Sequence, residues 1–600
     1  MTKSLTQDSA ALSLDSLDFA PWVKLQNHVR KLQQRIYRAE SLGQKRKVRD
    51  LQRLLMRSES ALAISIRQTT QLNKGKRTAG VDGFKALTST QRNKLYVQMK
   101  NMNIFCHQPK PTHRVYIPKG KGEKLRPLGI PTVKDRIFQN IVKLALEPQW
   151  ESHFEAISYG FRPRRSTHDA IEAISNKIGV KSKKKWIFEG DFKGCFDNLD
   201  HNFIMERIRE FPAKKVIEKW LKAGFVDNNI FHQTDNGTPQ GGIISPLLAN
   251  IALHGMEEEI GVNYRKKTEK KTGRIYHEVF DSKSVVRYAD DFVILCESKE
   301  EAQSIYAKLA PYLKARGLEL ASDKTRVVHI QEGFDFLGFN FKHYPVNQEK
   351  GRLWKLLVKP SKKSQEKMVD KLKETFEKNK GANVKKLIGD LNPLIRGYAN
   401  YWRHKVSKRI FSKMDNYIWS KVQKFLRRLH PKKSWKWITE RYFHKDLLGI
   451  SRNRWLLTDP DRKFQLIKMS WTPIVRYSMI QYKNSPFDSS LDEYFEKRAI
   501  KGFESNSIAS RQKLAKVQRH KCPLCSTNLH TGEALEVHHK TPKAKGGKDE
   551  YKNLSLVHTS CHILWHKVFP AKGKLPTEIQ IKAFQKMLKR ERTKEFCIGF

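Results

Sequence analysis

The chain has 600 residues with 39% hydrophobic content, and its 116 Lys and Arg outnumber its 61 Asp and Glu. This length predicts several domains, and the content of apolar and aromatic residues excludes an intrinsically disordered chain. A net charge of +55 is far larger than solubility requires, so it favours nucleic acid as the partner over an anionic membrane surface.

The sequence shows neither a membrane span nor a secretion signal. No run approaches the roughly 18 apolar residues of a span, and residues 1–20 lack a basic region followed by an apolar one. Four of the seven cysteines are scattered, whereas Cys522, Cys525 and Cys561 cluster in a His-rich tail. We therefore expect a cytoplasmic protein with a metal site in this tail, without a disulfide framework and without a membrane partner.

The hydrophobic pattern changes in character along the chain. Apolar residues recur at helical spacing over 22–70 with Lys and Arg between them, which predicts basic helices. Between 112 and 345, short apolar strands alternate with helices, the pattern of an α+β fold. Residues 360–480 are helical in pattern and rich in Lys, Arg, Trp and Tyr, which suits phosphate contact and base stacking, but equally a helix-bundle core. Residues 481–520 are loop-rich and basic.

Two apolar segments carry aspartates where a continuous strand would bury them. Asp290 and Asp291 are adjacent in VVRYADDFVILC (285–296), and Asp191 ends the strand pattern WIFEG (186–190). Because an unpaired buried carboxylate is costly, we expect the strands VVRY and FVILC to meet at a tight turn with both acids at its apex. Three carboxylates on adjacent strands could hold two Mg²⁺ ions about 4 Å apart for phosphoryl transfer. Any one of these acids alone is more simply a strand-end residue.

Further blocks follow in a fixed order, and together they resemble a bacterial group II intron-encoded reverse transcriptase and maturase over nearly the whole chain. These blocks are NKGKRTAGVDG (73–83), RVYIPKGKGEKLRPLGIP (114–131), SYGFRPRRSTHDA (158–170), GTPQGGIISPLLAN (237–250) and ELASDKTRVVH (319–329). The resemblance implies a multidomain α+β protein with a right-hand-like polymerase. Its parts would be an N-terminal extension (1–85), fingers and palm with an antiparallel sheet and helices (86–350), a helical thumb or maturase domain (351–480) and a DNA-binding region (481–515).

The resemblance also implies roles for individual palm residues. Asp191, Asp290 and Asp291 would bind the metals, with Asp290 bridging both ions together with Asp191 and with Asp291 more peripheral. Phe196, five residues after Asp191, would exclude a ribose 2′-hydroxyl and so favour dNTP over NTP. Core packing is the alternative role for this aromatic side chain.

Other polar residues are candidates for substrate contact by the same resemblance. Fingers residues would bind the incoming triphosphate, for which arginine offers bidentate contacts; a general basic surface is the alternative, above all for the lysines. Gln240 would lie near the nascent base pair, where neighbouring glycines allow close backbone approach. Lys324 would be a phosphate contact or general acid, or an ordinary solvated lysine. The fingers candidates are Lys119, Lys124 and Arg126.

The tail, residues 516–600, holds two sets of candidate metal ligands. Cys522-x-x-Cys525 and His558-x-x-Cys561 form a Cys₃His set suited to structural zinc. The remaining histidines resemble the HNH nuclease motif, which implies a small zinc-bound ββα domain. Within it, His539 would be the general base and Asn553 would orient the motif. The ligands of the catalytic divalent metal would be His538, His562 and His566.

Several readings of the tail stay open. If residues 561–568 are helical, His562 and His566 lie one turn apart and can share an ion. Many HNH proteins have Asp where His538 stands and Cys where His558 stands, so the metal's identity is open and His562 could compete for zinc. A single structural zinc site without nuclease activity is the simplest alternative.

The resemblance implies a multifunctional protein: RNA-directed DNA polymerase, splicing maturase and site-specific endonuclease that nicks the second DNA strand during retrohoming. Its partners would be group II intron RNA, double-stranded target DNA and dNTPs, with Mg²⁺ for both reactions and structural Zn²⁺. The protein would act in the cytoplasm, at the nucleoid when bound to DNA, and dimerisation is possible. The alternatives are a splicing factor without enzymatic role and an RNA-copying RNA polymerase that prefers NTPs.

Overall fold

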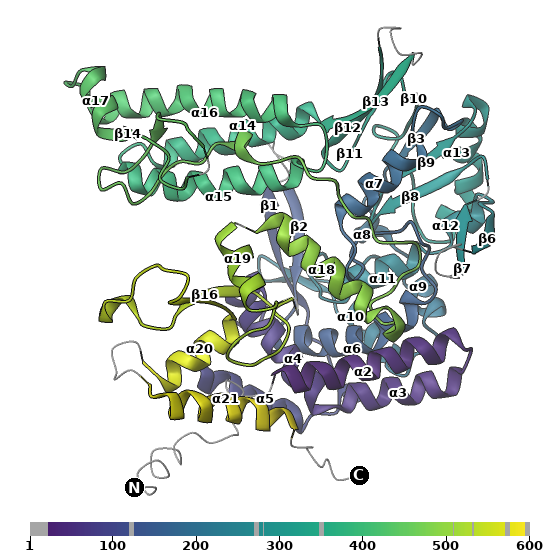
Figure 1. The fold of residues 1–600 in the computed structure, drawn as a ribbon. Coiled ribbons are helices and arrows are strands. Elements are labelled where there is room, and N and C mark those ends of the chain that lie inside the picture. Colours follow the sequence, from purple (N-terminus) through teal and green to yellow (C-terminus); the bar gives the residue numbers. More distant parts are fainter. Residues whose placement is uncertain are drawn as a thin grey trace, which may run out of the picture.

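The structure is a computed structural model that describes residues 22–118, 125–268, 275–279, 281–346, 353–449, 451–507, 509–530, 533–570 and 576–593. N-terminal helices form one end of the molecule and a bundle of long helices forms the other, while the C-terminal residues pack beside the N-terminal helices (Figure 1). This mixed α/β multidomain architecture confirms the predicted fold class at that level. None of the described helices combines the length and hydrophobicity that crossing a bilayer requires.

Basic amphipathic helices build the N-terminal part, as their hydrophobic spacing predicts. Ile36, Leu55 and Ile66 are fully buried in the same core as Ile137 of the central helix, while Lys and Arg occupy the outer faces. The helices are α2 (Trp22–Ser41), α3 (Lys45–Arg57), α4 (Glu59–Arg67), α5 (Ser89–Lys100) and the central α6 (Val133–Glu151).

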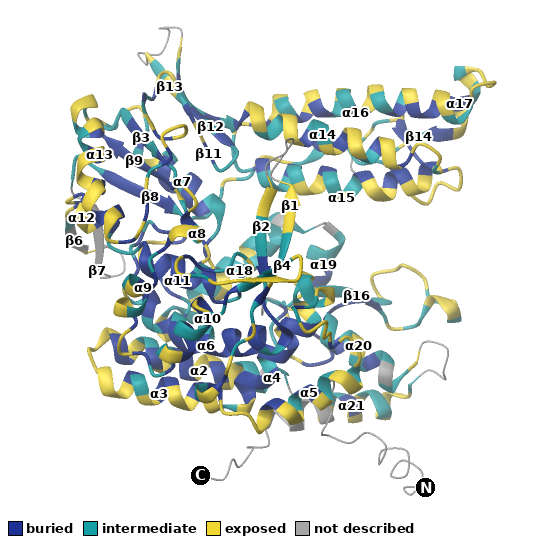
Figure 2. Cartoon of the chain, turned by 180° about the vertical axis from the view of Figure 1, so that it is seen from behind, coloured by how far each residue is buried: buried dark blue, intermediate teal, exposed yellow. Residues whose placement is uncertain are grey.

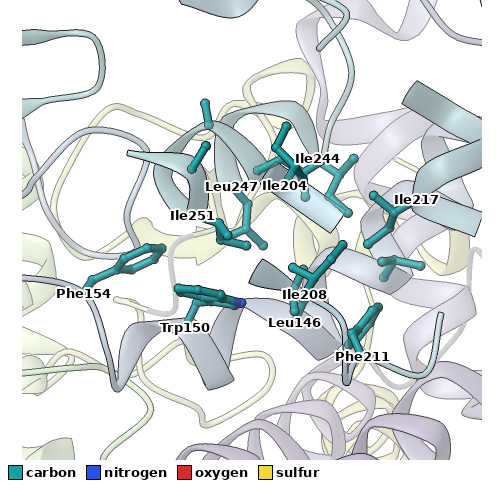
Figure 3. Packing of buried hydrophobic residues seen from close by; sticks show 14 of the residues in the cluster. Leu146, Trp150, Phe154, Ile204, Ile208, Phe211, Ile217, Ile244, Leu247 and Ile251 are labelled. Atoms are coloured by element: carbon teal, nitrogen blue, oxygen red, sulfur yellow. The ribbon is translucent and has the colours of Figure 1, made fainter. Parts of the chain in front are cut away.

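This core extends from α6 into the segments that follow it. Figure 3 shows Leu146 and Trp150 of α6 packed with Ile204, Ile208 and Leu247 from the helices that follow. Those helices are α8 (Cys195–Asn198), α9 (His201–Arg207), α10 (Lys214–Leu221), α11 (Ser245–Ala252) and α12 (Met256–Glu259).

A four-stranded antiparallel sheet, the palm sheet, has the strand order β10-β3-β9-β8. Ile187 and Phe188 are neighbours on one strand and are both fully buried, but they enter two different hydrophobic cores. The sheet is therefore covered on both faces, which explains its continuous apolar strands (Figure 2). Its elements are β3 (Trp186–Gly190), β8 (Ser284–Tyr288), β9 (Asp291–Cys296) and β10 (Arg326–His329), with helices α7 (Thr167–Lys177) and α13 (Lys299–Lys314) packed on them.

Smaller sheets flank the palm. In the fingers sheet, order β2-β1-β4-β5, the first hairpin joins β4 through a parallel pairing. Its strands are β1 (Thr112–Pro118), β2 (Leu125–Ile130), β4 (Phe225–Asp227) and β5 (Ile230–His232). The hairpin β6 (Tyr264–Thr268) and β7 (Ile275–Val279) and the sheet β11 (Phe334–Phe336), β12 (Phe339–Pro345) and β13 (Trp354–Pro360) complete this region.

Residues 362–449 and 451–457 form a bundle of helices with a small two-stranded sheet, which we call the thumb. Leu372, Leu387, Trp402 and Phe411 are fully buried between the helices, whose charged residues face outward (Figure 2). The elements are α14 (Lys362–Lys378), α15 (Val384–Trp402), α16 (Lys408–Leu429), α17 (Trp435–Tyr442), β14 (Phe443–His444) and β15 (Leu456–Leu457).

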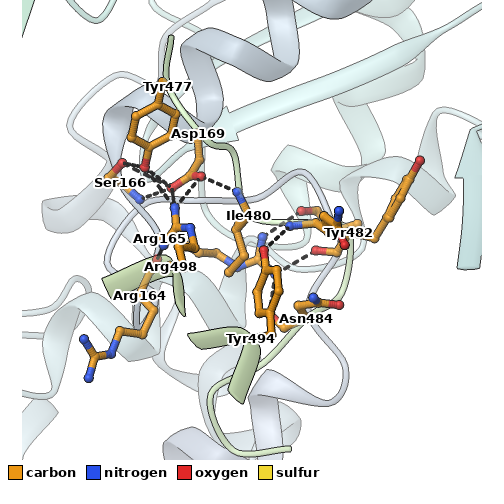
Figure 4. A network of polar contacts seen from close by, with 12 residues as sticks. Arg164, Arg165, Ser166, Asp169, Tyr477, Ile480, Tyr482, Asn484, Tyr494 and Arg498 are labelled. Atoms are coloured by element: carbon orange, nitrogen blue, oxygen red, sulfur yellow. Dashed lines mark hydrogen bonds and ion pairs between the residues drawn. The ribbon is translucent and has the colours of Figure 1, made fainter. Parts of the chain in front are cut away.

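The segment expected to be loop-rich instead contains two helices, α18 (Asp492–Asn506) and α19 (Ala509–Val517). It is held to the palm by Asp169 at the start of α7, which is fully buried. This carboxylate accepts hydrogen bonds from Ile480 N at 2.7 Å and Arg498 Nη2 at 2.9 Å (Figure 4). The prediction missed the helices because the partners that order them lie over 300 residues away in the chain.

The C-terminal residues form a ββα unit with its own hydrophobic core. Leu556, Trp565 and Phe584 are buried in that core together with the three clustered cysteines. The elements are β16 (Leu535–His539), β17 (Leu554–His558), α20 (Thr559–Val568) and α21 (Glu578–Thr593).

Candidate active sites

The paired aspartates lie at a tight hairpin turn. Strands β8 and β9 pair with Tyr288 opposite Asp291, so Ala289 and Asp290 form the turn. Ala289 has a φ of +59°, the left-handed conformation that lets two residues reverse the chain. The predicted turn is confirmed, with one difference: Asp290 belongs to the turn, whereas Asp291 is the first residue of β9.

The third acid lies beside this turn. Because Gly190 pairs with Phe292, the register places Asp191 next to Asp291 at the ends of adjacent strands. Asp291 is exposed to solvent on one side. Its pKa is nevertheless raised to about 6, mainly because neighbouring protein atoms displace water from the carboxylate and also because the charges of Asp290 and Asp191 repel it. The charges of Asp290 and Asp191 both act on Asp291, and a bound divalent cation would relieve this repulsion, so the three acids are candidate metal ligands.

Residues that the sequence analysis did not identify hold the turn. Arg287, 2% exposed, donates to the carbonyl of Ala289 at 3.1 Å and to Oδ1 of Asn250 at 3.0 Å. Asn250 in turn donates to the carbonyl of Gly160 at 2.8 Å. Gly160 is needed there because a Cβ would lie 2.2 Å from the backbone nitrogen of Ala289. No local signal reveals these roles, since the three residues come from separate blocks.

Lys324 lies at the end of the palm sheet that carries the three aspartates. Its Nζ contacts Oδ2 of Asp191 at 2.5 Å, and this hydrogen bond raises the pKa of the lysine. The loop that carries Lys324 is fixed by a backbone hydrogen bond from Ala321 to Asp191 at 2.8 Å. Lys324 is therefore a partner of a candidate metal ligand rather than a solitary solvated lysine.

Phe196 and Gln240 both lie near the short helix α8, which follows Asp191 in the chain. Phe196 on α8 is half-buried and meets the exposed ring of Phe161 edge-on at 6.2 Å, so it combines partial core packing with an accessible face. Gln240 donates to Asp197 at 3.3 Å. The expected close approach occurs at Gly241, where a Cβ would lie 2.6 Å from the carbonyl oxygen of Gly129 in the fingers.

The fingers candidates are only partly placed. Arg126 is exposed on β2, opposite Ile117 of β1. Lys119 and Lys124 lie outside the described residues.

The tail contains a compact Cys₃His cluster. The ligand atoms of these four buried residues lie within 4.8 Å of one another. His558 Nε2 bonds the carbonyl of Asn528 at 3.0 Å, which turns Nδ1 toward Cys525 Sγ at 3.3 Å. The other thiols and His558 lower the pKa of Cys525 and so favour the thiolate that zinc requires. The cluster members are Cys522, Cys525, His558 and Cys561.

Three histidines form a second cluster, with His538 on β16 and with His562 and His566 on α20. His562 and His566 lie one turn apart, and their Nε2 atoms are 3.0 Å apart. Burial, followed by the two neighbouring imidazoles, lowers the pKa of His538 to about 4, and its Nδ1 is buried without a hydrogen-bond partner. Facing imidazole nitrogens of this kind fit a shared cation. Because His562 groups with His538 and His566, it stands apart from the cysteine set.

The candidate base is oriented by its neighbours. His539 Nε2 bonds Oδ1 of Asp549 at 2.7 Å, and Asp549 also accepts from Lys543. The side chain of Asn553 accepts a hydrogen bond from the N–H of Thr541 at 2.7 Å and donates one to its carbonyl at 3.0 Å. These two bonds fix the loop that follows His539. Glu536 on β16 is hydrogen-bonded to Nδ1 of His562 and is a further positioning residue. It and Asp549 were missed in the sequence because their role depends on which histidine nitrogen they face.

The fold and these sites define a polymerase palm joined to a helical thumb and an HNH-type tail, and family comparisons agree. Residues 117–341 match the family model of reverse transcriptase (RNA-dependent DNA polymerase), and residues 18–99 match its N-terminal domain. Residues 365–443 match the group II intron maturase-specific domain, and residues 522–567 match HNH endonuclease.

Relatives identify the family. The protein YkfC of Escherichia coli is 36% identical over 294 residues, which cover 45% of this chain and 77% of that protein. The group II intron-encoded protein LtrA of Lactococcus lactis is 34% identical over 331 residues, 46% of this chain but only 54% of LtrA. A Candida albicans telomerase structure aligns with a TM-score of 0.31 at 12% identity, over 56% of this chain and 61% of that chain.

The chain belongs to the group II intron-encoded reverse transcriptase family. It is a multifunctional group II intron protein in its domain content, since reverse transcriptase, maturase and HNH endonuclease domains are all present. The expected family and its combination of two enzyme domains are thereby confirmed.

Proposed function

We propose that the chain copies RNA into DNA, assists the splicing of a group II intron RNA and nicks target DNA so that the intron can insert. The observation that carries this proposal is the convergence of Asp191, Asp290 and Asp291 at the ends of two adjacent palm strands. The proposed domain limits are those expected from the sequence, at residues 85, 350, 480 and 515. We further propose action in the bacterial cytoplasm, at the nucleoid when DNA is bound.

In the polymerase, the three aspartates would hold two Mg²⁺ ions, which neutralise the charge that develops on the attacking and leaving oxygens. Lys324 pairs with Asp191 and would contact a substrate phosphate beside the metal ligands. The accessible face of Phe196 would exclude a 2′-hydroxyl, so dNTPs are the proposed substrates. Gln240 and Arg126 would contact the nascent pair and the triphosphate; Lys119 and Lys124 keep their proposed triphosphate roles.

In the tail, the Cys₃His cluster would hold a structural zinc, and the histidine cluster would hold the nuclease metal, which supplies charge stabilisation at the scissile phosphate. Because His539 Nε2 is engaged by Asp549, Nδ1 is the nitrogen that would take the proton from the attacking water. The two separate clusters support this division over a single structural site.

RNA binding is proposed for the outer end of the thumb. We call Trp419, Leu448, Trp455 and Phe464 the outer thumb surface, because they are 37%, 55%, 54% and 43% exposed. Trp455 stacks on Phe443 with ring centroids 5.8 Å apart. Residues 419–463 hold thirteen Lys and Arg against four acids, so exposed rings lie in a strongly basic surface. Such a surface suits unpaired RNA bases better than an apolar protein partner.

Primer extension on an RNA template tests the polymerase proposal. We expect cDNA from the wild type, none from Asp290→Ala, and a milder loss from Asp291→Ala because the family resemblance makes Asp291 the more peripheral ligand. Phe196→Ala should admit NTPs. A wild type that makes no cDNA would leave a splicing factor as the better description, and a wild type that prefers NTPs would indicate an RNA polymerase.

Nicking of a duplex built from the sequences that flank the intron tests the nuclease proposal. His539→Ala should abolish second-strand nicking and leave cDNA synthesis intact. Loss of both activities would mean that the tail has mainly a structural role.

A further inference from the structure

A buried ion pair joins the N-terminal helices to the tail. Arg67, the last residue of α4, is 5% exposed, and its Nη2 lies 3.0 Å from Oε1 of Glu533. The guanidinium also lies 4.4 Å from the ring centroid of Trp22 on α2. A charge taken so far out of water stays ionised only where a partner is held in good geometry, so this contact specifies one arrangement of the two parts.

The same carboxylate caps the helix that carries the nuclease ligands. The residue preceding α20 makes no side-chain capping bond, and the first turn of α20 contains no acid. Glu533 supplies both a capping hydrogen bond and a negative charge from outside the helix, because its Oε1 accepts from the backbone N–H of Ser560 at 2.8 Å. A negative group at this end also complements the helix dipole. Arg67 therefore reaches the start of α20 through one side chain.

The candidate nuclease ligands His562 and His566 follow Ser560 by two and six residues. Both histidines lie on α20, whereas the third member of the cluster, His538, lies on β16, so a small rotation of α20 would change how the two imidazoles meet His538 around an ion. The position of the helix start thus decides the geometry of the cluster, as outer partners do for metal ligands in general.

We propose that Arg67 is a positioning residue for the HNH nuclease: it holds Glu533, Glu533 caps α20, and α20 presents the histidine cluster. Nicking then depends on the docking of the tail against the polymerase's N-terminal helices, where Figure 1 shows α20 and α21 beside α4 and α5. The packing of α21 on α2 and the contact between Glu496 of α18 and Asn528 support the same docked arrangement. This inference rests on the proposed nuclease function.

The test uses the full chain with Arg67→Met, Glu533→Gln and the double variant. Arg67→Met removes the charge and keeps an unbranched stem, whereas Glu533→Gln keeps an oxygen for the Ser560 N–H. Arg67→Met should slow nicking about tenfold and raise the Mg²⁺ concentration needed for half-maximal nicking. Glu533→Gln should have a smaller effect, and the double variant should be no worse than Arg67→Met, because both changes break one link. Arg30→Met is the matched control, since Arg30 pairs with Asp492 away from the nuclease.

Hydrogen exchange gives a readout that does not need activity. The amides of α20 should exchange faster in Arg67→Met than in the wild type or Arg30→Met, with zinc content and cDNA synthesis unchanged. Unchanged nicking and unchanged α20 exchange would overturn the link, and so would equal losses of nicking and cDNA synthesis. If the wild type does not nick, the proposed nuclease function fails, but faster α20 exchange would still establish the positioning contact.

Discussion

Glu257 on α12 is 5% exposed, close to a second buried carboxylate, Glu155. Burial and the charge of Glu155 raise the pKa of Glu257 to about 8, while Tyr264 donates a hydrogen bond to it. Glu155 behaves in the opposite way: burial alone would raise its pKa, but the hydrogen bond with His254 lowers it to about 2. One carboxyl of the pair is therefore protonated at neutral pH and the other is ionised.

Glu257→Gln should make the stability of the protein less dependent on pH. The pKa of Glu257 is raised on folding from 4.5 to about 8, so its contribution is fully present below 4.5 and is lost as pH rises toward 8. Between pH 5 and 8 we expect the wild type to lose on the order of 1 kcal/mol per pH unit more than the variant. Denaturation midpoints at pH 5, 6.5 and 8 measure this, and parallel curves for the two proteins would contradict it.

Residues differ in how far the sequence identifies them. Asp191, Asp290 and Asp291 can be named from the sequence because acids within apolar strands are costly and so need a reason. Arg287 and Asn250 could not be named, since each acts through the backbone of a residue distant in sequence. Glu536 and Asp549 could not be identified from the sequence for a related reason, because their role depends on which histidine nitrogen they face.

At the scale of elements, the composition of the thumb did not show which of its aromatic side chains would be buried and which exposed. Its aromatic residues suit either a bundle core or base stacking, and the structure divides them between the two. Trp402 is fully buried between helices, whereas Trp455 is 54% exposed on the outer thumb surface. Periodicity predicted the helices correctly but could not say which ring would face water, because that depends on neighbouring elements.

Trp455→Ala should weaken binding of single-stranded RNA. Stacking of one base on an aromatic ring contributes about 1–3 kcal/mol, so we expect roughly a tenfold loss of affinity. Leu448→Ala is the matched control, since Leu448 is equally exposed but has no ring. Fluorescence titration with a 12-nucleotide oligouridine measures the effect, and Trp455→Phe should restore binding. Equal losses for Trp455→Ala and Leu448→Ala would argue for a general apolar contact.

At the scale of the whole molecule, three hydrophobic cores support the described chain, and the tail's core is the smallest. It includes the buried Cys522, Cys525 and Cys561 themselves, so its folding should depend on the ion that joins them. The two larger cores contain none of these residues. Loss of zinc should therefore disrupt the tail and spare the polymerase.

Cys522→Ser should release zinc and expose residues 509–593 to protease, with the midpoint of tail unfolding lowered, while cDNA synthesis stays within about twofold of the wild type. Cys106→Ser is the control, because Cys106 is an exposed cysteine outside the cluster. Metal analysis and limited proteolysis measure these outcomes. A tail that remains protease-resistant without zinc would contradict the proposed structural role.

The sequence by itself predicted the order of the domains, the three palm acids, the two sets of tail ligands and, from a charge of +55, a polyanionic partner. These follow from local spacing, from the cost of burying charge and from composition. Only the tertiary structure decided that Lys324 pairs with Asp191, that α18 is a helix tied to Asp169, and that Arg67 reaches the start of α20. Each of these contacts joins residues over 100 positions apart, and no local pattern carries such a pairing.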